Sequence, residues 1–130
     1  MYIKHIYCIV DSNLKNEFSI AQKAWKKISV EKGFIAQIGG WSETNPNKAV
    51  IISIWKNKKY YHHFMENVHD LITNTSKQAQ TYAAIKTTFE EKIISKTKLN
   101  NEIQKAISNN FFADGNTKVL IENSWTVLPF

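Results

Sequence analysis

The chain has 130 residues, the length of one domain, and 43 % of them are hydrophobic and 22 % charged. This composition can bury a core and excludes wholesale disorder. The formal net charge is +6, but all 17 basic residues are lysine and they are scattered along the chain. Because specific nucleic-acid contacts rely on arginine and on a clustered basic stripe, we expect solvated charge and no nucleic-acid partner.

The cellular compartment is indicated by the single cysteine, Cys8. One cysteine excludes a disulfide within the chain and indicates a reducing environment. Cys8 lies in an apolar stretch, which predicts a small side chain in the core. No stretch approaches 18 consecutive apolar residues, and the N-terminus lacks a signal-peptide pattern. We therefore expect a cytoplasmic protein with no membrane partner.

The first three elements follow from the spacing of apolar residues. Residues 2–10 are rich in β-branched and aromatic side chains and predict a strand. A helix is predicted over residues 14–30, where the apolar spacing changes to three and four: Leu14, Phe18, Ala21, Trp25 and Ile28. A second strand is predicted over 34–41, where Gly39 and Gly40 indicate a bulge, a bend or a close backbone approach.

The next elements complete a known arrangement. After a turn at Asn45-Pro46-Asn47, residues 49–55 predict a third strand. Residues 58–73 carry an apolar helical stripe, and residues 82–94 predict a fourth strand. The order β-α-β-β-α-β is that of the ferredoxin-like α+β fold, with both helices on one face of the sheet. We assign residues 1–95 to this domain.

The third strand is apolar on both faces, so both need a cover. The helices cover one face, and a second copy of the sheet is the simplest cover for the other, which predicts a homodimer. Residues 96–130 are expected to form a C-terminal extension packed on the same domain. It would hold a helix over 98–110, a turn at 113–116 and a last strand over 119–128.

Several local strings resemble one bacterial protein family. They are Gln22-x-x-Trp25, Gly33-Phe34-x-x-Gln37-x-Gly39-Gly40-Trp41, Ala49 leading to Trp55, Tyr61-x-x-Phe64-Met65-x-x-x-His69-Asp70, and Gln80-Thr81-Tyr82. Together they are similar to the uncharacterised YdbC-like family of the dimeric α/β-barrel superfamily, over about residues 2 to 90. That superfamily includes antibiotic-biosynthesis monooxygenases, haem-degrading monooxygenases and stress-responsive barrel proteins, so the resemblance implies the fold more directly than any chemistry.

A pocket between the helices and the sheet is one interpretation of the aromatic residues. Five side chains are expected to converge there and bind substrate: Gln22, Trp25, Gln37, Trp41 and Phe64. The alternative is that they only fill the core. A functional site predicts a cavity of roughly 300 Å³ or more with His69 or a glutamine in its wall, whereas a core predicts no void larger than a water or two.

Histidine chemistry centres on His69, which borders the apolar stripe of the second predicted helix. This position suits an acid or base near neutral pH, and the alternative is a histidine at the edge of the core. His62 and His63 are adjacent on the same helix and diverge. No spacing of His, Cys, Asp or Glu resembles a metal motif, so we expect no metal.

Two functions therefore stay in competition. The first is a monooxygenase-like enzyme that uses no cofactor and acts on a small aromatic or apolar molecule, with His69 as catalytic acid or base. The second is a non-catalytic barrel that binds a small molecule or serves in a stress response. Haem degradation is a third idea, but the relatives with that activity use an asparagine on the first strand and a tryptophan where this chain has Phe64.

Overall fold

The computed structural model describes residues 1–76 and 78–128, so residues 129–130 at the end of the predicted extension lie outside the described part. In chain order the strands are β1 (Tyr2–Ile9), β2 (Phe34–Ser42), β3 (Lys48–Trp55), β4 (Ala84–Glu91), β5 (Phe111–Asp114) and β6 (Thr117–Ile121). The α-helices are α1 (Lys15–Gln22), α2 (Lys58–Asn67), α3 (His69–Ser76) and α4 (Lys96–Asn109). Short 3₁₀ helices span Ser12–Leu14, Lys23–Val30, Gln78–Gln80 and Asn123–Trp125.

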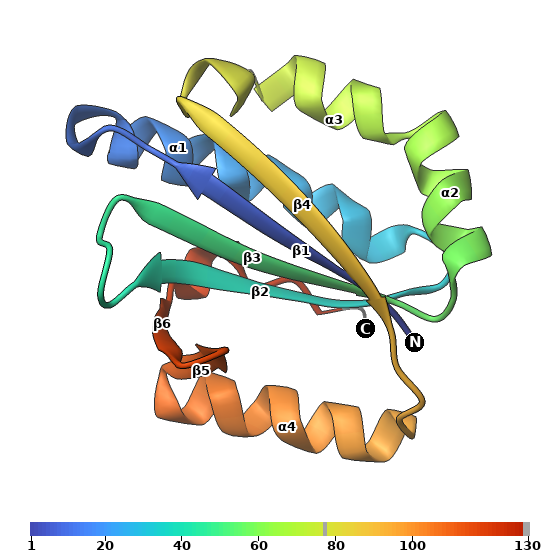
Figure 1. The fold of residues 1–130 in the computed structure, drawn as a ribbon. Coiled ribbons are helices and arrows are strands. Elements are labelled where there is room, and N and C mark those ends of the chain that lie inside the picture. Colours follow the sequence, from blue (N-terminus) through green and yellow to red (C-terminus); the bar gives the residue numbers. More distant parts are fainter. Residues whose placement is uncertain (77, 129–130) are drawn as a thin grey trace.

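The sheet has the strand order β4-β1-β3-β2-β6-β5 and is antiparallel throughout. Its first four strands, with the crossover helices between them, have the split βαβ arrangement. The ferredoxin-like α+β prediction is confirmed. Figure 1 shows α1, α2 and α3 together on one face of this sheet and α4 on the other.

Each of the two helices predicted from its apolar stripe consists of two helical segments in the structure. The first changes from α to 3₁₀ geometry at Lys23. The second is broken at Val68, whose φ of −127° and ψ of −34° leave the helical region, and α3 begins directly after the break. Among residues 1–76 and 78–128, no helix has both the length and the apolarity that a bilayer crossing requires.

The face of the sheet opposite α1–α3 is covered by the chain itself. Leu99 and Ile103 of α4 are buried in one cluster with apolar residues of three strands: Ile3, Ala36, Ile38 and Ile54. The inference that a second copy is the simplest cover for this face of β3 is therefore corrected, because α4 provides a cover. The homodimer stays a prediction, but the need to cover this face of the sheet no longer supports it.

The C-terminal segment wraps around the β2 edge of the sheet. A strand at Phe111–Asp114 precedes the predicted last strand, which ends at Ile121 and not near residue 128. The resulting β5–β6 hairpin pairs with β2 beside Gly40, where a Cβ atom would lie 1.7 Å from the carbonyl oxygen of Leu120. Only glycine permits this backbone approach.

Beyond β6, the segment returns to the helix-covered face. Trp125 is fully buried, and its Nε1 donates to Ser19 Oγ at 2.9 Å. The backbone of Val127 then exchanges two hydrogen bonds with Gln37, each 2.9 Å long. The C-terminal segment thus pairs with β2 and packs on both faces of the sheet beside it.

Candidate functional site

A cavity of about 160 Å³ lies between the sheet and the helices α1, α2 and α3. The expectation of about 300 Å³ is too large. The void nevertheless exceeds one or two waters, and an engineered cavity of about 150 Å³ in another protein takes up benzene. The space therefore suits one aromatic ring with small substituents.

Aromatic side chains form most of the helix-side wall. Phe64 and Tyr61 come from α2, and Trp25 comes from the 3₁₀ helix that continues α1. Trp55, at the end of β3, packs against Phe64 with ring centroids 5.1 Å apart. Trp25 lies 6.3 Å from Phe64 in an edge-to-face arrangement. These contacts fix the rings in place and present apolar surface to the cavity.

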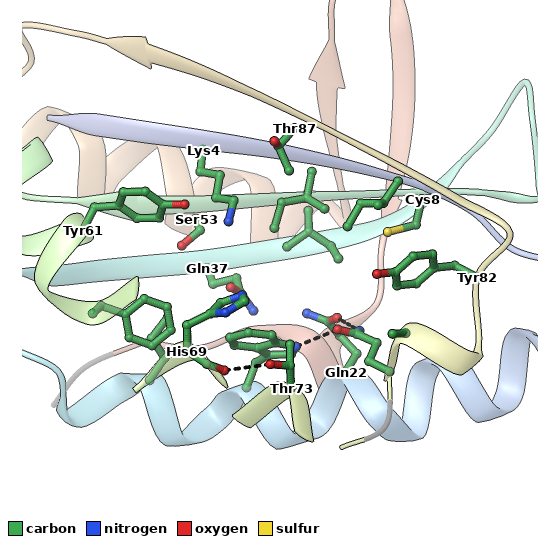
Figure 2. A pocket seen from close by; sticks show the side chains of 18 of the residues that line it. Lys4, Cys8, Gln22, Gln37, Ser53, Tyr61, His69, Thr73, Tyr82 and Thr87 are labelled. Carbon is green, nitrogen blue, oxygen red and sulfur yellow. Dashed lines mark hydrogen bonds between the residues drawn. The ribbon is translucent and has the colours of Figure 1, made fainter. Parts of the chain in front are cut away.

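The sheet side of the cavity holds a row of three polar side chains. Ser53 on β3 is the register partner of Lys4 on β1 and of Gln37 on β2. Neighbours in such a row have Cβ atoms about 5 Å apart. Figure 2 shows these three side chains on the sheet side of the cavity, with His69 reaching in from the helix side.

Lys4 is an unusual member of this row because it faces an aromatic, apolar space. Its Nζ lies 5.1 Å from the ring centroid of Tyr61 and 6.0 Å from that of Phe89. Burial lowers the pKa of Lys4 from 10.5 to about 8, since desolvation disfavours the ammonium. Within the described residues, no aspartate or glutamate lines the cavity to compensate that charge.

Gln37 is aimed at the cavity by an irregularity in its strand. The β2–β3 register shifts between Phe34 and Ala36, so Ile35 is an extra residue. Such a bulge reverses which face the following side chains occupy, and it turns Gln37 toward the helices. The side chain is 3 % exposed, and its Nε2 has no hydrogen-bond partner among the described residues. A buried amide without a partner is costly, by about 1–3 kcal/mol.

Ser53 and Tyr61 add hydroxyl groups to the same space. The Ser53 oxygen accepts a hydrogen bond from Trp55 Nε1 at 3.0 Å, which leaves its own hydrogen to donate. Burial, with a smaller contribution from Tyr2, raises the pKa of Tyr61 to about 12. Tyr61 therefore stays protonated at neutral pH and is a donor.

His69, the first residue of α3, supplies an imidazole to the opposite wall. Its Nδ1 lies 3.2 Å from Asp70 Oδ1, and its ring packs 5.5 Å from Trp25 and 6.0 Å from Phe64. If Nδ1 carries the proton shared with Asp70, Nε2 is the unprotonated nitrogen and has the form of a base. Asp70 is 89 % exposed, so solvent screens this pair.

Gln22 occupies the end of the cavity near α1. Gln78 donates from Nε2 to the Gln22 Oε1, while its own Oε1 accepts from Trp25 Nε1 at 2.8 Å. This chain of hydrogen bonds fixes the wall, so Gln22 and Trp25 are positioned by a residue that the sequence analysis did not single out. Gln78 is itself buried.

Trp41 is the one proposed binding residue that lies outside the cavity, and its assignment is corrected. Its ring packs against Trp125, with centroids 5.3 Å apart, and against Phe18 at 5.7 Å. Trp41 does share the helix-facing side of β2, as its alternation predicts. However, the C-terminal segment inserts Trp125 at that end of the sheet and makes it part of the core.

The side chains of the cavity wall that sequence reasoning missed include Lys4, Ser53 and Gln78. The position of Lys4 could have been predicted, because it alternates with Tyr2, Ile6 and Cys8 on one face of the first strand. A lysine on an otherwise buried face calls for an explanation. Among the residues that the structure describes, no three His, Cys, Asp or Glu side chains form a cluster that suits a metal ion.

Sequence comparison gives a family and one curated relative. Residues 2–89 match a family described as a domain of unknown function, DUF4937. The chain is also similar to the uncharacterized protein YdbC of Bacillus subtilis (strain 168). Identity is 42 % over 93 residues, which cover 70 % of this chain and 78 % of that protein.

Solved structures of the same fold extend the comparison. A candidate antibiotic biosynthesis monooxygenase from Nitrosomonas europaea superposes with a TM-score of 0.61 at 21 % identity, covering 72 % of this chain and 100 % of that one. A mutant of SnoaB, a cofactor-independent oxygenase from Streptomyces nogalater, has a TM-score of 0.57 at 12 % identity, covering 72 % and 95 %. A candidate monooxygenase from Lactobacillus acidophilus NCFM has a TM-score of 0.57 at 10 % identity, covering 98 % and 77 %. At these identities the likeness shows the fold.

Proposed function

The chain belongs to the DUF4937 family and is YdbC-like in sequence, and on that premise we propose a monooxygenase-like enzyme that acts on a small aromatic or apolar molecule. The observation that carries this proposal is the cavity itself, where an aromatic wall and an imidazole face a row of hydrogen-bond donors. All three fold neighbours described above are monooxygenases or oxygenases by name, which supports the choice of reaction.

His69 has the role of base in this proposal. Its Nε2 takes a proton from the substrate, and the resulting anion reacts with dioxygen, which is the oxidant. For a phenol, dioxygen gives one oxygen atom to the quinone product and the other leaves as water. The chain contributes proton removal, orientation of the ring and exclusion of bulk water, and no cofactor is required.

The test measures oxygen uptake and the mass of the product when wild type and His69→Gln are each supplied with a panel of single-ring phenols. We expect His69→Gln to lose turnover by roughly 10²-fold or more while it keeps affinity for the ring. His63→Gln is the matched control, because His63 is exposed on α2 and bonds its neighbour Asn67. Equal turnover in wild type and His69→Gln would exclude this base. Ring binding without any oxygen uptake would leave the non-catalytic binder.

Assembly as a homodimer is also part of the proposal, together with a cytoplasmic location that suits the single thiol. Strand β4 is an edge of the sheet, and all its residues are exposed. Ile85 and Phe89 on it are 51 % and 45 % exposed, so a partner there would bury apolar surface and an open edge. We expect a total buried area above roughly 1,000 Å². A monomer in sedimentation at micromolar concentration would contradict this assembly.

A further inference from the structure

We infer that the cavity binds its ligand through an anionic oxygen on a single aromatic ring, held by the row of Lys4, Ser53 and Gln37. This inference rests on the proposed function, because it names the chemical class of ligand for the same cavity. The ligand is a phenolate or an aromatic carboxylate, and the shared chemistry is one ring carrying one negatively charged oxygen.

The row of Lys4, Ser53 and Gln37 offers hydrogen-bond donors to the cavity. An ammonium has three N–H donors and no acceptor, and a primary amide nitrogen has two. The two outer members, Lys4 and Gln37, are both register partners of Ser53, so the three side chains lie side by side on the sheet side of the cavity, and a ligand oxygen there can accept from them.

In the described part of the chain, these donors have no protein acceptor to bind. Among the described residues, Gln37 Nε2 is buried without a partner, and the Lys4 ammonium lies beside two aromatic rings. No carboxylate lines the cavity in the described part of the chain. A lysine desolvated against apolar walls lacks its counter-charge, and a ligand anion would supply it.

The size and the remaining walls of the cavity fit one aromatic ring. The cavity of about 160 Å³ has room for one ring. Trp25, Trp55 and Phe64 are the apolar surfaces on which such a ring would pack. Tyr61, which stays protonated at neutral pH, is a further donor beside Lys4. A polar molecule without a ring would leave these walls unused, and a neutral hydrocarbon would leave the donors unsatisfied.

The probes are 4-nitrophenol, 4-nitrobenzoate and nitrobenzene, which differ in the anionic oxygen and keep the nitro-substituted ring. The nitrophenolate ion is yellow, so its ionisation is followed by absorbance. We expect binding to lower the pKa of 4-nitrophenol by about one unit, because a cation lies next to the oxygen. Comparison of phenolate with benzoate identifies which of the two anions the row prefers.

Two variants disrupt the anion site, one by removing its positive charge and the other by adding a negative charge. Lys4→Met replaces the charge with an apolar chain of similar length and should weaken phenolate binding about tenfold or more. Gln37→Glu places a carboxylate in the row, which pairs with Lys4 and should have the same effect. Both should retain affinity for nitrobenzene. Lys105→Met, at an exposed lysine on α4, is the control for loss of one positive charge and should bind like wild type.

The outcomes separate this inference from the function on which it rests. Tighter binding of either anion than of nitrobenzene, lost in Lys4→Met and Gln37→Glu, supports it. Equal binding of all three probes overturns the anion site and leaves a neutral-ring pocket in place. If none of the three binds, including nitrobenzene, then both the anion site and the proposed function fail.

Discussion

Replacement of Lys4 by methionine should stabilise the protein at neutral pH. The ammonium loses hydration on folding and gains only aromatic contacts. Its pKa falls from 10.5 to about 8, and that interval corresponds to roughly 2–3 kcal/mol of unfolding free energy after allowance for partial solvent access. Methionine fills a similar volume without a charge. We expect Lys4→Met to raise the free energy of unfolding by up to that amount.

The sign of the pH dependence follows from linkage. Below about pH 8 the lysine is charged in both the folded and the unfolded chain, so the full penalty applies. Between about pH 8 and pH 10.5 the folded chain loses its proton first, and the stability of wild type rises relative to the variant. Above that range the amine is neutral in both states and the charge penalty disappears. The advantage of Lys4→Met should therefore shrink as the pH rises through this window.

Urea unfolding followed by tryptophan fluorescence, at about pH 7 and about pH 9.5, measures both quantities. Burial raises the pKa of Cys8 and of Tyr61 to about 12, so alkaline pH also destabilises the fold through these groups. Both proteins contain them, and the difference between wild type and variant isolates Lys4. A variant no more stable than wild type at neutral pH would refute the desolvation argument, as would an advantage that stays constant with pH.

Three further experiments test the packing of the fold. Gly40→Ala should lower the free energy of unfolding by about 2 kcal/mol, measured by urea unfolding, because its Cβ would collide with Leu120; Gly115→Ala, which has open space around it, should show only the backbone cost of about 1 kcal/mol. Truncation after Ser95 should lower the melting temperature or cause aggregation, since it uncovers the face beneath α4, and a truncated chain that melts and sediments like the full one would contradict this. Cys8, buried and with its pKa raised to about 12, should react with iodoacetamide at neutral pH far more slowly in the folded chain than in urea, because the folded state keeps the thiol protonated.

The strands and their order were predictable because each carries a local pattern. Alternation and β-branched content place β1 to β4 close to their observed ranges, and the two helices between them complete the topology. The helix break at Val68 has no comparable signal, since the apolar stripe continues through it. The β5 strand was missed because Phe111 and Phe112 adjoin the end of a helix and precede a turn, so its strand pairing is set by the partner β6 and not by its own sequence.

The site was harder to predict than the fold because cavities are set by packing between distant segments. Gln22, Gln37 and His69, which were predicted to line a pocket, do line the cavity, but Gln37 faces it because the bulge at Ile35 shifts the alternation of β2. Trp41 satisfies the same alternation and still lies elsewhere, since Trp125, from 84 positions along the chain, fills the space beside it. Alternation assigns a face of the sheet, but the position along that face depends on what else packs there.

The C-terminal segment has a part in the site without contributing to its wall. Among the described residues, all those that line the cavity fall within residues 2–89, the range that matches the family. Yet Gln37, which lines the cavity, is held by two backbone hydrogen bonds to Val127. The donor row is thus provided by the family domain, while the extension pairs with the strand that carries one end of it. Residues 2–89 should therefore determine which ligand binds. The C-terminal segment should determine how rigidly Gln37 and its neighbours in the donor row are held.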